Sequence, residues 1–169
     1  MRSNLLITVR TNAMRRLLLA VALLAPGCAD DGMTGDDEQT VDCALETRDD
    51  DFAVGLSKTG TSGLLMFTLM NATPATPTRG DNTWVIQINQ SASGVAGPTV
   101  DGASLDVTPY MPDHRHPAGK TVVIEPTGTP GQYELSPINL WMPGLWENTI
   151  EASTTGGDDS VVIRVCVPS

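Results

Sequence analysis

Three residues that favour soft and borderline metal ions lie within six positions of the chain, in the stretch MPDHRH. Met111 offers a thioether sulfur, and His114 and His116, the two histidines of the chain, offer imidazole nitrogens. Thioether ligands favour copper(I) over hard cations such as Ca²⁺, while imidazole suits copper and zinc. On an extended backbone both histidines project to the same side. The stretch therefore predicts a copper site, although a His-x-His in a proline-rich turn is also typical of a solvated loop.

A second Met-Pro pair follows in the stretch LWMPGLWE, where Met142 lies between two tryptophans. If strand pairing brings Met142 close to Met111, two sulfurs and two imidazoles form a four-ligand set for copper. Zinc is the less favoured alternative, with both histidines and Asp113 as a hard third ligand. Met142 also fits a purely structural role, because methionine sulfur packs well on aromatic edges.

The start of the chain indicates export. Residues 1–27 contain no acidic residue, and four arginines precede the apolar run LLLAVALLA. This order is typical of a signal peptide, and the run is shorter than the roughly 20 residues of a membrane-spanning helix. Translation could begin at Met1 or at Met14.

The apolar run ends in LLAPGC, which resembles the lipobox of bacterial lipoproteins through Gly27 and Cys28, while Ala25 and Pro26 depart from the usual pattern. The resemblance implies that Cys28 is lipidated and anchors the protein in the cell envelope, facing the periplasm or the exterior. An ordinary secreted protein is the alternative. Residues 28–42 are rich in Asp, Gly and Thr and are expected to form a disordered acidic tether.

Charge excludes nucleic acid as a ligand. The whole chain carries −10 and residues 1–27 carry +4, so the part from Cys28 onward carries −14. Phosphate binding requires a basic surface, which this composition does not supply. The negative field attracts cations, without selecting among them.

The remaining cysteines, Cys43 and Cys166, lie near the two ends of residues 43–169. In an oxidising compartment such a pair predicts a disulfide, with two free thiols as the alternative. The pairing would leave no thiolate as a metal ligand.

Residues 43–169 are predicted to form one all-β domain, an immunoglobulin-like antiparallel β-sandwich of about seven to eight strands. Short apolar or alternating runs are separated by turn sequences such as TRGDN, SGVAG and TGTPGQ. Trp84, Ile86 and Ile88 alternate with other residues, and Val161, Ile163 and Val165 do the same, which places each set on one buried face. The runs are FAVGLS, GLLMFTLM, TWVIQINQ, SLDVTPYM, KTVVIEP, QYELSPINL, WENTIEAS and SVVIRVCV.

The sequence gives little support to an enzyme. Both histidines fall in one short stretch, and no Gly-x-Ser-x-Gly elbow, phosphate-binding loop, HExxH or paired-cysteine zinc motif occurs. Catalysis by carboxylates would require a pocket in which several of them converge.

The segments MPDHRH, GQY and MPGLW, in this order between about residues 80 and 152, resemble the YtkA-like domain of bacterial exported proteins. The resemblance implies an immunoglobulin-like sandwich associated with copper binding and with copper supply to cuproenzymes. Met111, His116 and Met142 match the family pattern, whereas His114 stands where methionine is common. Tyr133, Gly144 and Trp146 match as well, in positions expected to be structural.

These observations together predict a membrane-tethered, extracytoplasmic copper-binding domain without catalytic activity, which carries or buffers the ion for a cuproenzyme or copper-carrier partner. The competing hypothesis is a structural or protein-interaction lipoprotein with the same fold and no metal. Copper(I), copper(II) and, less favoured, zinc stay open at this point.

Overall fold

A computed structural model describes residues 40–169 of the chain. The predicted signal peptide, the lipidation residue Cys28 and most of the predicted tether lie outside the described residues. Within the described part, no helix is long and apolar enough to cross a membrane.

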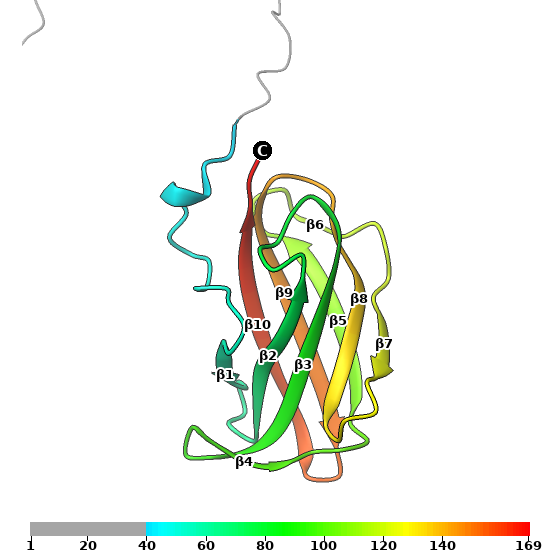
Figure 1. Ribbon diagram of the computed structural model, residues 1–169. Coiled ribbons are helices and arrows are strands. Elements are labelled where there is room, and N and C mark those ends of the chain that lie inside the picture. Colours follow the sequence, from blue (N-terminus) through cyan, green and yellow to red (C-terminus); the bar gives the residue numbers. More distant parts are fainter. Residues whose placement is uncertain (1–39) are drawn as a thin grey trace, which may run out of the picture. The chain divides into compact units, whose positions relative to one another are not determined.

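Two antiparallel sheets pack face to face (Figure 1). The first has the order β1-β2-β3-β8-β7, with β4 paired to one end of β3, and the second has the order β10-β9-β5-β6. The strands of the first sheet are β1 (Ser57–Thr59), β2 (Leu65–Thr73), β3 (Gly80–Ala92), β4 (Val95–Thr99), β7 (Val123–Pro126) and β8 (Gln132–Leu140). Those of the second are β5 (Ser104–Met111), β6 (His116–Pro117), β9 (Gly144–Thr154) and β10 (Gly157–Val167). A short 3₁₀ helix, η1 (Cys43–Leu45), precedes them.

The predicted all-β sandwich is confirmed, with ten strands in the described residues instead of seven or eight. The strand predicted over residues 52–57 is wrong: Gly55 has a positive φ of 95°, and the Phe52 ring instead packs on Trp84 with centroids 4.9 Å apart. The segment SGVAG was expected to be a turn throughout, but its last three residues begin β4, which pairs with the long strand β3.

The core lies between the two sheets and follows the predicted alternation. Trp84, Ile86 and Ile88 are fully buried on β3, and on β10 the alternating valines and Ile163 are buried as well. Trp146 of β9 is also fully buried. Because every second residue of these strands faces the core, the sandwich holds its end loops on a rigid frame.

The disulfide between Cys43 and Cys166 is confirmed. It joins η1 to the last strand across 123 residues of sequence. Downstream of it, the Asp50 N–H donates to the Arg164 carbonyl and the Asp50 carboxylate accepts from the Arg164 N–H, at 3.0 and 2.8 Å. The segment from Cys43 to Phe52, here called the N-terminal strap, is therefore fastened along β10.

Candidate metal site

The hairpin between β5 and β6 carries three of the four predicted ligands. Met111 ends β5 and pairs in register with His116 of β6. Arg115 adopts a left-handed φ of 58°, and its N–H donates to the Met111 carbonyl at 2.7 Å. This bond closes a tight turn, with His114 at its exposed tip.

The two imidazoles lie next to each other. Their ring centroids are 5.9 Å apart and their planes are tilted by 55°. His116 Nδ1 lies 3.0 Å from the Pro117 carbonyl oxygen, and because a carbonyl can only accept, Nδ1 carries the hydrogen. Nε2 of His116 is then the nitrogen with a lone pair for a metal ion. A backbone carbonyl that orients a histidine in this way is a common feature of metal sites.

Met111 lies much deeper than the histidines. Its side chain is fully buried, and its methyl group approaches Gly144 closely: a Cβ placed on Gly144 would be 2.7 Å from Met111 Cε. Gly144 also has a φ of 127°, which disfavours any other residue there. The first residue of β9 thus leaves room for the end of the Met111 side chain.

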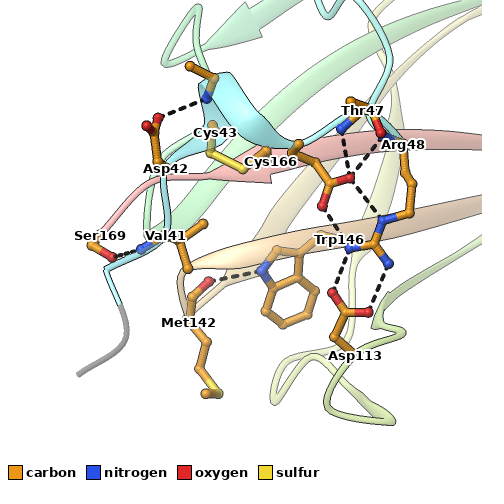
Figure 2. Close-up of a disulfide and its surroundings, with 12 residues drawn as sticks. Val41, Asp42, Cys43, Thr47, Arg48, Asp113, Met142, Trp146, Cys166 and Ser169 are labelled. Carbon is orange, nitrogen blue, oxygen red and sulfur yellow. Dashed lines mark hydrogen bonds and ion pairs between the residues drawn. A yellow bond between two sulfur atoms is a disulfide. The ribbon is translucent and has the colours of Figure 1, made fainter. Parts of the chain in front are cut away.

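Met142 belongs to the loop between β8 and β9 and is half-buried against the core. Figure 2 shows the Trp146 indole N–H donating to the Met142 carbonyl oxygen, at 2.9 Å. This bond fixes the backbone of Met142 two residues before Gly144. The loop is therefore anchored at the same end of the sandwich as the histidine hairpin.

Trp141 connects the two loops. Its indole stacks on the His116 ring, with centroids 5.3 Å apart and an angle of 26° between the planes. Trp146 approaches the same imidazole edge-on, with centroids 6.1 Å apart. His116 therefore has an indole on one face and a second indole at another side. Trp141 itself is 45% exposed.

Asp113, the predicted third zinc ligand, is engaged by the N-terminal strap. The Arg48 guanidinium donates to both Asp113 oxygens at 2.9 and 2.8 Å (Figure 2). It also donates to Glu46. The hydrogen bond from Arg48 lowers the pKa of Asp113, and the same arginine lowers the pKa of Glu46 to about 2. Both carboxylates stay ionised as partners of Arg48, an ion pair that fixes the strap to the histidine hairpin.

The donor set fits copper better than a hard divalent ion. Imidazoles that share a metal at about 2 Å per nitrogen place their centroids roughly 5 to 6 Å apart, which matches the pair seen here. Within residues 40–169, no three His, Cys, Asp or Glu side chains gather to hold a metal ion. A site built on the two imidazoles would need further donors, and thioether sulfur beside imidazole is a combination that copper prefers.

A hollow at the opposite end of the sandwich is lined by Glu151, Asp158 and Asp159. Asp159 is buried and accepts hydrogen bonds from four backbone N–H groups, those of residues 62, 64, 65 and 160, at 2.7 to 2.9 Å. Burial raises its pKa, but these bonds outweigh burial and lower it overall. Asp159 therefore fastens the loop before β2.

Two residues at the metal-site end were not predicted from the sequence. Trp141 neighbours the Met-Pro-Gly motif, and its position there is the only signal that could have identified it. Arg48 is 65 residues from Asp113 in sequence, and no local pattern indicates that they meet.

Comparison with known families finds a match over the middle of the chain. The family model described as YtkA-like matches residues 65–151, from the start of β2 to within β9. No curated protein and no solved structure matches the chain.

Proposed function

Since the chain belongs to the YtkA-like family, whose model covers more than half of it, we propose that it is an extracytoplasmic copper-binding domain. In this proposal copper is cargo, which the domain carries or buffers for a cuproenzyme or copper-carrier partner, and the domain catalyses nothing. In this proposal residues 1–27 direct export, and residues 28–42 with a lipid on Cys28 form the expected membrane tether.

The neighbouring imidazoles of His114 and His116 carry the proposal. Their centroids lie 5.9 Å apart, and Nε2 of His116 is left with a lone pair by the bond from Nδ1 to Pro117. Two imidazoles with this ring spacing can share one ion at about 2 Å per nitrogen without a large movement of the hairpin. The ordering cost of binding is correspondingly small.

Both methionines add support. Met111 pairs with His116 in the hairpin, and Met142 lies two residues before the glycine that contacts the Met111 methyl. Sulfur from both residues would complete the set of Met111, His114, His116 and Met142. Asp113 contributes no ligand in this proposal, because Arg48 occupies both of its oxygens.

The test is a titration of the purified protein with Cu(I) and with Cu(II), each in competition with a chelator of known affinity. Replacing His114 or His116 by Ala, or Met142 or Met111 by Leu, is expected to weaken binding at least about tenfold. Leucine is chosen because a volume-conserving exchange keeps the buried Met111 position filled.

Two variants serve as controls. Met70 is an exposed methionine on β2, outside the candidate site, so Met70→Leu should leave copper binding unchanged. Cys28→Ala removes a thiol that would itself bind Cu(I) wherever it is not lipidated. Wild-type affinity in all four ligand variants would refute the proposal and favour the structural or protein-interaction alternative.

A further inference from the structure

Trp141 is a large, half-exposed side chain whose position the fold alone does not require. It lies in the loop between β8 and β9, outside both sheets, and its stacking partner is a proposed ligand. The tryptophans of the core, Trp84 and Trp146, are by contrast fully buried.

The orientation of the His116 ring does not depend on its stacking with Trp141 alone. The bond from Nδ1 to the Pro117 carbonyl already fixes one edge of the imidazole, and Trp146 approaches the ring from another side. Trp141 instead covers a ring face that water would otherwise reach. An indole face also attracts a cation, with a strength that increases when water is excluded.

The proposed ligands give the ion no compensating charge. Met111, its partner in register, is fully buried, and the nearest carboxylate in sequence, Asp113, is already paired with Arg48. Imidazole and thioether ligands are neutral, so they leave the full charge of the ion uncompensated. The cost of moving an ion out of water increases with the square of its charge, and a monovalent ion is therefore tolerated best in this setting.

We infer that Trp141 is a specificity-determining residue, which covers His116 and makes the site prefer Cu(I) over Cu(II) and Zn²⁺. The inference rests on the proposed function, because it concerns the same four ligands. It assigns the cargo an oxidation state that the two histidines alone leave open.

The experiment measures Cu(I), Cu(II) and Zn²⁺ affinities of the wild type, Trp141→Ala and Trp141→Phe. We expect Trp141→Ala to weaken Cu(I) binding roughly 2- to 30-fold, the range of cation–π contributions, and to leave Cu(II) and Zn²⁺ binding unchanged or stronger. Trp141→Phe retains an aromatic face and should fall between the wild type and the alanine variant.

Tryptophan fluorescence gives a second measurement. Cu(I) should quench the emission of the wild type, and the part of this quenching that comes from Trp141 should be lost in Trp141→Phe, while Trp146 beside His116 and Trp84 on the other sheet are present in both proteins. A loss of emission on Cu(I) addition that is as large in Trp141→Phe as in the wild type would overturn the inference, because Trp141 would then contribute nothing to the quenching.

The outcomes separate the two proposals. A wild type that binds no copper refutes the proposed function. A wild type that binds copper, together with a Trp141→Ala variant that loses affinity for all three ions equally, leaves the proposed function intact and overturns the inference, since Trp141 would then only position His116.

Discussion

Replacing Gly144 by alanine tests the link between fold and site most directly. Gly144 opens β9 with a φ of 127°, and an added Cβ would lie 2.7 Å from the Met111 methyl carbon. Two costs follow. A non-glycine residue in this backbone region costs about 1 to 3 kcal/mol. Displacing the end of a flexible methionine adds about 1 kcal/mol, the lower end of what overpacking a core costs.

The expected loss of stability is therefore about 2 to 4 kcal/mol. For a domain of about 130 residues this corresponds to a fall in Tm of roughly 8 to 16 °C. Urea unfolding of the oxidised protein, followed by circular dichroism, measures the free energy directly. Copper affinity should also fall in the folded Gly144→Ala variant, since the displaced methyl moves the sulfur of Met111.

A double-mutant cycle separates the two costs. Leucine at position 111 has no atom corresponding to Met111 Cε, so Gly144→Ala should cost about 1 kcal/mol less in the Met111→Leu background than in the wild type. Equal costs in both backgrounds would show that the methyl contact contributes nothing, and the steric part of this reasoning would be refuted.

Three further predictions concern the frame of the sandwich. Replacing Cys43 and Cys166 together by alanine should lower the free energy of unfolding, measured in urea, by about 2 to 5 kcal/mol. A reducing agent should destabilise the wild type by the same amount and leave the double variant unchanged. Asp159→Asn should cost about 2 to 4 kcal/mol at pH 7, because a carboxylate that accepts several backbone N–H bonds loses its charge. The folded pKa of Asp159 lies below its ordinary value of 3.8, so this contribution is present above about pH 4 and is lost as the pH falls through the lowered pKa. The unfolding free energies of the wild type and Asp159→Asn should therefore converge in acid, and a difference that does not shrink as the pH falls below about 4 would contradict the assignment. Tyr133→Phe removes a hydroxyl that accepts from the Ala103 N–H at 2.8 Å and should cost about 1 kcal/mol, whereas an unchanged urea midpoint would show that water replaces the bond.

Much of the fold could be predicted because alternation of apolar residues survives in the long strands. β5 and β8 begin and end at the residues predicted for them, and the buried face of β3 is the one that alternation indicated. The errors lie where local composition and tertiary contacts disagree. Phe52 lies in an apolar run that looks like a strand, but its ring packs on Trp84 from the N-terminal strap.

The disulfide could be predicted because the predicted export and the small number of cysteines leave few alternatives. The ion pair of Arg48 with Asp113 could not, since sequence does not indicate which of many charged residues meet across 65 positions. The stack of Trp141 on His116 was missed for a similar reason. It depends on how two loops from different strand pairs meet at one end of the sandwich.

The depth of Met111 is different, because the sequence does contain the signal for it. In the run SLDVTPYM, Leu105, Val107 and Pro109 occupy every second position, and Met111 continues the same series. Val107, Pro109 and Met111 are buried as this period requires. If MPDHRH is interpreted as one loop, this continuity is missed. Met111 is the last residue of β5 and lies in the core, and both histidines follow after β5 ends. A site built on this hairpin therefore joins a sulfur fixed by core packing to imidazoles fixed by turn geometry, and the two kinds of ligand should respond to different substitutions: Met111 to changes in the core at Gly144, and His116 to changes in the loop at Trp141.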